Sequence, residues 1–197
     1  MLDYKIAKLS DQVYEIQNFI TQDELDQVMQ FIKERDNSDW DNPDTPYEFW
    51  SGKTLKADLL KEKRIFDLLN QRVKTLFSGT FDVTGISLQR YMINDALGEH
   101  TDDHDGHAAN NEKVFCGLVL YYNDEYQGGE LNYPKLNIIH KPKAGSLLIH
   151  GGKILHGTLP VKSNSVRYIS TMFVKHQIGE EMFFNEKIFG DVKWVAS

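Results

Sequence analysis

Residues 99–107, EHTDDHDGH, hold three histidines and three aspartates in nine positions. Imidazole and carboxylate groups are common ligands of divalent metal ions. One residue separates His100 from Asp102, so on a β-strand both side chains would point to the same face while Thr101 points away. This pair could bind one ion from one side, although a His-x-Asp pattern alone more often belongs to a hydrated loop. A bound ion would need a third ligand from elsewhere in the chain.

The residues that follow predict a loop over such a site rather than further ligands. The sequence becomes rich in asparagine, glycine and alanine, and loops at the rim of a site often carry binding residues. We expect His104 to be the side chain of this loop that could contact a substrate. We do not expect metal to bind to Asp103, His104, Asp105 or His107.

A second strand-like segment offers the third ligand. His156 lies in GGKILHGTLPV (residues 151–161), between an apolar pair and Gly-Thr, where a histidine can point into a barrel. Two histidines and one carboxylate on one side of a metal leave three coordination positions open, the arrangement of non-haem iron(II) oxygenases. Those positions let an enzyme bind a cosubstrate and O2. The ordinary alternative for a lone histidine is a core residue with a satisfied hydrogen bond.

A cosubstrate with a carboxylate should then meet a fixed cation. Arg167 lies eleven residues after His156 on the next predicted strand, and arginine pairs with carboxylates through two parallel hydrogen bonds. Alternation along the strand places Arg167 on the same side as Ile169 and Thr171. A surface ion pair is the alternative for Arg167. Tyr91 and Tyr121, on two other predicted strands, could donate hydrogen bonds inside the barrel or simply pack there.

The composition limits the classes of protein to consider. The chain has 197 residues, 41% of them hydrophobic, and can bury a core as one domain, with or without a subdomain. Its net charge is −7 with lysine and arginine scattered, which disfavours nucleic acid as a partner. No apolar run reaches the roughly 20 residues that span a bilayer, so we expect no membrane partner. Cys116 is the single cysteine and we expect it in the core; with no apolar leader, this favours the cytoplasm.

The elements that must position these residues change in type along the chain. We expect a helical layer over residues 1–79, with a capping box at Thr21 and Glu24 and a second amphipathic helix over 57–77. The aromatic segment 39–52 is expected to be a loop, either a substrate lid or a segment packed against the helices by its own aromatic residues: Trp40, Tyr47, Phe49 and Trp50.

The following part of the chain predicts a β core. Short β-branched or aromatic runs, separated by Gly, Asn and Pro, predict strands at 81–94, 114–123, 129–133, 138–141, 145–149 and 166–175. Many short strands favour a sandwich or jelly-roll barrel over a parallel sheet. We therefore expect a mainly β, α+β chain of one domain, with the jelly-roll core at 80–175. A C-terminal extension at 176–197 has no assigned function.

These motifs, in this order, resemble the 2-oxoglutarate- and Fe(II)-dependent dioxygenases, in particular the prolyl 4-hydroxylase-like branch. The resemblance covers roughly residues 87–174 and includes GGEL at 128–131 and PKAG at 142–145. It implies a double-stranded β-helix, cupin-like, with Fe(II) on His100, Asp102 and His156. It also implies that 2-oxoglutarate pairs with Arg167, helped by Tyr121 or Tyr91. Thr158 joins these as a candidate cosubstrate contact.

The resemblance also implies a reaction. O2 and 2-oxoglutarate would be consumed, succinate and CO2 released and a C–H bond hydroxylated, with ascorbate recovering oxidised iron. Asp102 favours hydroxylation, because related halogenases lack this carboxylate. Collagen-type prolyl hydroxylases usually have lysine where this chain has Arg167, which disfavours a collagen-like substrate. His150 stands where the family often has an aromatic residue.

The favoured substrate is a prolyl residue in a peptide or protein, by resemblance alone. One alternative is a hydroxylase of a free amino acid or other small molecule: an open groove would favour a peptide and a closed cavity a metabolite. An alternative of a different class is a non-catalytic, cupin-like sensor of metal or 2-oxoglutarate. Nucleic-acid demethylation would require a basic stripe near the site, which the sequence lacks.

Overall fold

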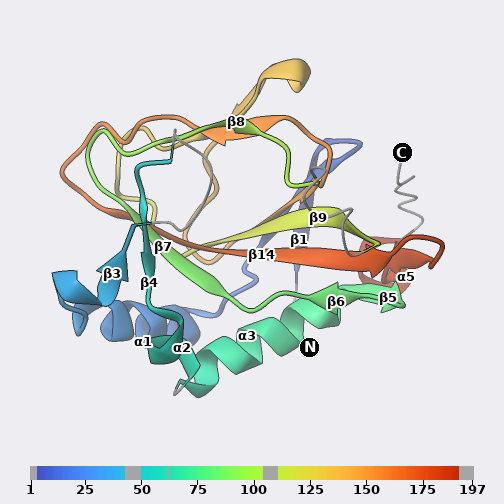
Figure 1. Cartoon of the computed structure of the whole chain (residues 1–197), viewed down its shortest axis with the longest axis horizontal. Coiled ribbons are helices and arrows are strands. Elements are labelled where there is room, and N and C mark those ends of the chain that lie inside the picture. Colours follow the sequence, from blue (N-terminus) through green and yellow to red (C-terminus); the bar gives the residue numbers. More distant parts are fainter. Residues whose placement is uncertain (1–3, 43–49, 62, 104–110, 191–197) are drawn as a thin grey trace.

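Two antiparallel sheets face each other in the computed structural model, which describes residues 4–42, 50–61, 63–103 and 111–190. Figure 1 shows helices α1, α2 and α3 on one side of the large sheet and strand β8 of the small sheet on the other. This arrangement confirms the predicted mainly β jelly-roll core buttressed by helices.

The large sheet, as far as the described residues show, has nine strands and lies on one side of the site. In spatial order these are β1 (Lys5–Ser10), β2 (Val13–Gln17), β12 (Leu147–Gly151), β9 (Glu112–Tyr121), β14 (Arg167–Gln177), β7 (Ser87–Tyr91), β4 (Lys53–Leu55) and β3 (Trp40–Asp41), with β6 (Asp82–Val83) pairing with β14.

The small sheet has four strands within the described part of the chain and carries His100 and His156. Its order is β11 (Ile138–His140), β10 (Leu131–Tyr133), β13 (His156–Thr158) and β8 (Leu97–His100). A separate pair joins β15 (Met182–Phe184) to β5 (Phe77–Gly79). Between the sheets lies a cluster of buried side chains that includes four tyrosines: Tyr91, Tyr121, Tyr126 and Tyr133.

The helices bury one face each against the outer side of the large sheet. They are α1 (Gln22–Lys33), α2 (Ala57–Lys61), α3 (Arg64–Lys74) and the short α5 (Glu186–Phe189), with 3-10 turns η1 (Asn37–Asp39) and η2 (Pro134–Leu136). The predicted capping box is present: Thr21 Oγ1 accepts from the Glu24 amide, and the Glu24 carboxylate accepts from the Thr21 amide. None of the helices among the described residues has both the length and the apolar character needed to cross a membrane.

The N-terminal layer differs from the helical prediction. Residues 5–17 form β1 and β2, and β2 pairs with β12 of the core, more than a hundred residues away in the chain. A strand of this kind is stabilised by pairing with a distant strand, and the local sequence pattern on which the helical prediction was based cannot predict that partner. The predicted 57–77 helix is two helices, α2 and α3, and its last residues enter β5. On its predicted apolar stripe, Leu68 is 39% exposed.

Two segments without a predicted element contribute strands. The aromatic segment 39–52 begins in β3 and is followed directly by β4, which pairs with β3 and with β7; residues 43–49, with Tyr47 and Phe49, lie outside the described residues. The C-terminal extension adds β15 and α5, whose Phe184 and Phe189 join the core.

Candidate metal and cosubstrate site

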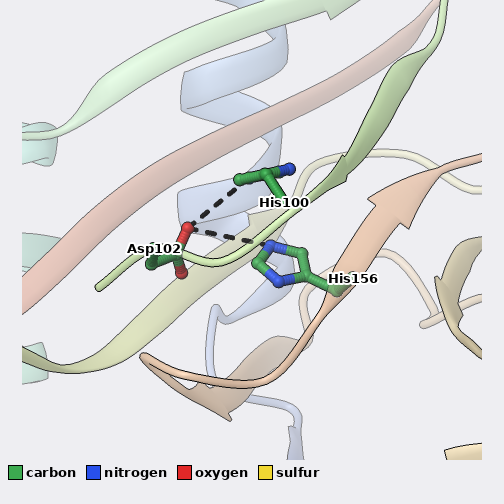
Figure 2. Close-up of side chains that lie close together, drawn as sticks. All are labelled: His100, Asp102 and His156. Carbon is green, nitrogen blue, oxygen red and sulfur yellow. Dashed lines mark ion pairs between the residues drawn. The ribbon is translucent and has the colours of Figure 1, made fainter. Parts of the chain in front are cut away.

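Three side chains converge at the edge of the small sheet (Figure 2). Asp102 Oδ1 lies 3.6 Å from His100 Nε2 and 3.7 Å from His156 Nε2. One potential ligand atom from each residue lies within 4.8 Å of the other two, so a single cation between them could contact all three. The structure therefore brings together the three predicted ligands.

Strand pairing places the two histidines side by side. His100 and His156 are partners in the antiparallel ladder of β8 and β13, and their ring centroids are 4.4 Å apart. The register shifts just after this pair, at Gly157, where a Cβ atom would come within 2.9 Å of the Leu97 carbonyl oxygen. Contrary to the strand prediction, β8 ends at His100, and Asp102 reaches the site from the turn that follows.

Backbone carbonyls fix which ring nitrogen of each histidine is available. His100 Nδ1 lies 2.9 Å from the Gly98 oxygen, and His156 Nδ1 lies 2.9 Å from the Ile154 oxygen. A carbonyl can only accept, so each Nδ1 donates its hydrogen. In the neutral rings the Nε2 atom of each histidine then carries the lone pair and lies on the side of Asp102, and this outer hydrogen bond at Nδ1 is usual for metal-binding histidines.

The charge states suit a cation. Burial opposes ionisation of Asp102, but the facing His156, His100 and His150 outweigh it and hold the pKa of this carboxyl far below its ordinary value. Burial and the neighbouring His150 lower the pKa of His156 to about 3, so its ring is neutral near pH 7. A buried carboxylate beside a neutral imidazole is a suitable donor pair for a divalent ion.

Arg167 lies fully buried at the start of β14 with donors that lack acceptors. Its Nη2 donates to the Tyr121 hydroxyl at 3.3 Å. Its Nε and Nη1 find no hydrogen-bond acceptor among the described residues. Unpaired N–H groups of a buried guanidinium are costly, and a carboxylate of a ligand would satisfy them.

The candidate cosubstrate residues surround Arg167 in different ways. The guanidinium lies over the rings of Tyr91 (4.9 Å) and Tyr121 (5.3 Å). Burial raises the pKa of Tyr91 to about 12, and its hydroxyl donates to Gln89 Oε1 at 3.1 Å. Thr158 is buried and lines the same cavity. The structure thus places Tyr91 and Tyr121 against Arg167 and Thr158 in the lining of the same cavity, and their roles are taken up as proposals.

A cavity of about 430 Å³ joins the two ends of the site. Its lining includes the three potential ligands, Arg167 and the predicted neighbours on the inner side of β14, Ile169 and Thr171. Trp50, from the aromatic segment, also lines it, whereas Trp40 is buried against Tyr168 and Arg90. His104, Asp105 and His107 lie outside the described residues.

His150 is the site residue whose role the sequence did not indicate. It is buried on β12, and its Nε2 lies 3.0 Å from Asp102 Oδ2 while its Nδ1 lies 3.1 Å from the Tyr133 hydroxyl. The available signal was a histidine inside the apolar run SLLIHGG. Its partner Asp102 is 48 residues away, so the sequence could not identify the contact.

Comparisons with known proteins agree with this geometry. Residues 86–175 match the model of the 2OG-Fe(II) oxygenase superfamily. No curated protein sequence is similar enough to count as a match.

Among solved structures, a prolyl hydroxylase from Trichoplax adhaerens, in complex with a peptide fragment of the hypoxia inducible factor oxygen degradation domain, is similar over 84% of this chain and 84% of its own, with 17% identity and a TM-score of 0.64. The viral collagen prolyl hydroxylase of Paramecium Bursaria Chlorella virus-1 is similar over 83% of this chain and 96% of its own, with 20% identity and a TM-score of 0.54. HygX from Streptomyces hygroscopicus, with nickel, 2-oxoglutarate and hygromycin B bound, is similar over 85% of this chain and 84% of its own, with 12% identity and a TM-score of 0.61.

At these identities the structural similarity is evidence of a shared fold only. The family match covers the residues that include His100, Asp102, His156 and Arg167. Residues 86–175 are thus similar to the 2OG-Fe(II) oxygenase superfamily, and the fold of the chain is similar to that of solved prolyl hydroxylases.

Proposed function

We propose that this chain is a dioxygenase that hydroxylates a C–H bond, with the favoured substrate a prolyl residue in a peptide or protein. The observation that carries the reaction type is the pairing of two elements in one cavity. These are a cluster of two histidines and one aspartate whose potential ligand atoms converge, and a buried arginine with unpaired donors. In this proposal O2, 2-oxoglutarate and the substrate give succinate, CO2 and the hydroxylated product.

The metal end would hold Fe(II) through His100, Asp102 and His156. The donor set fits iron(II), because two imidazoles and one carboxylate on one side leave positions for ligands on the other. Bound iron supplies the redox chemistry that couples O2 to oxidative decarboxylation of 2-oxoglutarate, and ascorbate would return oxidised iron to Fe(II). The chain's own task is to hold the His156 imidazole neutral and Asp102 ionised.

The anchor end would bind the far carboxylate of 2-oxoglutarate. Arg167 offers Nε and Nη1, and Tyr121 adds a hydroxyl beside Nη2. Tyr91 would shape the pocket by packing under the guanidinium, and Thr158 would contact the cosubstrate from β13. Burial of this end excludes water and strengthens each charged hydrogen bond.

The prolyl substrate is supported by the fold relatives, which include the viral collagen prolyl hydroxylase and the Trichoplax enzyme with its peptide. A small-molecule substrate is the second candidate. A cavity of about 430 Å³ lies in the usual range of small-molecule sites, and HygX, with hygromycin B bound, has the same fold. We also propose that residues 1–197 act as one domain, because the large sheet packs against the helices in one core cluster and against the small sheet in the other.

Succinate formation tests the reaction type. The protein would be assayed with 2-oxoglutarate in air, with and without Fe(II), against proline peptides and free amino acids. We expect iron-dependent succinate in the wild type and none with His156→Ala, because that variant lacks one potential ligand. The matched control is His176→Ala, whose histidine lies on the exterior and bonds to the Glu180 carbonyl.

The outcomes separate the candidates. Stimulation by a proline peptide supports the prolyl substrate, and stimulation by a free amino acid alone supports a small molecule. Tight iron binding without turnover under any condition would refute the enzyme and leave the non-catalytic sensor.

A further inference from the structure

Asp102 uses its two carboxylate oxygens for different partners. Oδ1 faces the Nε2 atoms of His100 and His156, at 3.6 and 3.7 Å. Oδ2 points the other way, to His150 Nε2 at 3.0 Å. A carboxylate oxygen without a proton can only accept, so His150 must donate from Nε2.

Tyr133 holds the other side of the His150 ring. With Nε2 protonated, the neutral imidazole leaves Nδ1 as an acceptor, and the Tyr133 hydroxyl, 3.1 Å away, donates to it. Tyr133 is fully buried on β10 and His150 is buried on β12. The two sheets therefore contribute one residue each to a chain of hydrogen bonds that ends on Asp102.

The absence of a side chain at Gly117 makes space for the hydrogen bond between Asp102 and His150. Gly117 is the partner of His150 in the β9–β12 ladder. A Cβ atom at position 117 would overlap with both Asp102 Oδ2 and His150 Nε2. Glycine inside a ten-residue strand weakens that strand and often marks a close approach. Here the close approach is the Asp102–His150 hydrogen bond.

We propose that His150, oriented by Tyr133, is a positioning residue that keeps Asp102 a one-oxygen metal ligand. This inference rests on the proposed function. A carboxylate that binds through both oxygens would occupy one of the three positions that a two-pronged cosubstrate and O2 need together. By engaging Oδ2, His150 directs Oδ1 to the metal and leaves that position open.

Metal binding, followed without turnover, tests the proposal. Co(II) would be titrated into the protein, and the dissociation constant and the visible spectrum of bound Co(II), which reports coordination number, would be recorded. Outer partners of metal ligands typically contribute about 10- to 100-fold in affinity. We expect His150→Leu to weaken Co(II) binding by about that factor and to change the spectrum.

Two variants separate positioning from loss of structure. Glutamine can place its side-chain N–H near the former Nε2, so His150→Gln should recover most of the affinity and the wild-type spectrum. The matched control is His140→Leu. It removes another contact between a histidine and a carboxylate, in which a partly exposed imidazole lies 2.9 Å from the buried Glu15 carboxylate, and neither residue lines the cavity. It should lower thermal stability but leave Co(II) affinity unchanged.

Each outcome decides the proposal. Wild-type affinity and spectrum in His150→Leu, or no recovery in His150→Gln when its thermal unfolding matches the wild type, would overturn it. Absence of metal binding by the wild type overturns both this inference and the proposed function. Wild-type Co(II) binding that is weakened by His150→Leu, together with no succinate from the iron-loaded protein, would support the positioning role and refute only the dioxygenase.

Discussion

Two arginines of this chain are held in opposite ways. Arg72, on α3, donates from Nη1 to Glu24 Oε2 at 2.8 Å and to the Phe19 carbonyl at 2.7 Å, and its Nη2 pairs with Glu24 Oε1. Arg167 is more deeply buried, yet its Nε and Nη1 have no acceptor in the described part of the chain. One guanidinium completes the fold, and the other offers unused donors to a cavity.

The same contrast separates the two ends of the site. At the metal end, the Nδ1 atoms of His100 and His156 and the Oδ2 atom of Asp102 already have hydrogen-bond partners in the protein. At the anchor end, the protein leaves the hydrogen bonds of Arg167 incomplete. Metal-ligand orientation is thus built into the fold, whereas the anchor would be completed by the cosubstrate. Buried charges retained without full pairing often mark function rather than stability.

Replacing Arg167 should produce the largest effect. Two charge-assisted hydrogen bonds contribute about 3 kcal/mol or more, so Arg167→Met should raise the KM for 2-oxoglutarate by about 100-fold or more. The free energy of unfolding without ligand should fall little or even rise, because an apolar side chain removes unpaired buried donors. Steady-state kinetics and urea unfolding check both. An unchanged KM would mean that Arg167 is not the anchor.

Arg72→Met should show the reverse pattern. The loss of hydrogen bonds to a half-buried carboxylate should lower the free energy of unfolding by about 1–2 kcal/mol at pH 7, with no change in the KM for 2-oxoglutarate. The Arg72 guanidinium lowers the pKa of Glu24 to about 2 from its ordinary 4.5. Because the folded-state pKa is the lower one, this stabilisation is present above pH 4.5 and is lost as the pH falls toward 2.

Unfolding curves at several pH values check that sign. The stability difference between the wild type and Glu24→Gln should shrink steadily between pH 4.5 and pH 2. A difference that stays constant over this range would show that the carboxylate charge of Glu24 does not stabilise the fold.

The comparison also shows what a sequence can and cannot predict. Arg167 was singled out because it follows His156 by eleven residues on the next predicted strand, where a carboxylate of a cosubstrate would need a cation; its role stays a prediction. The spacing of His100 and Asp102 and the position of His156 in a strand-like segment predicted that the three side chains converge, and the structure places them together; their role as metal ligands stays a prediction. The Glu24 capping box was local and was confirmed, but its pairing with Arg72, 48 residues away, was not predicted.

Contacts between distant segments account for what the sequence missed. His150 meets Asp102 only because β12 lies beside β9, and Gly117 gives no sign in the sequence that it makes room for them. Likewise, β1 and β2 exist through pairing at the edge of the large sheet, where β2 meets β12. The local pattern of residues 5–17 does not determine that partner, which is why a helical layer was expected there.

The smallest effect distinguishes the two tyrosines near Arg167. The Tyr121 hydroxyl accepts from Arg167 Nη2, whereas the Tyr91 hydroxyl is already engaged with Gln89. Tyr121→Phe should therefore raise the KM for 2-oxoglutarate by about three- to tenfold, the value of one hydrogen bond of about 1 kcal/mol. Tyr91→Phe keeps the ring under the guanidinium and should change the KM less. If Tyr91→Phe had the larger effect, the anchor would bind its carboxylate on the β7 side of Arg167 rather than on the β9 side.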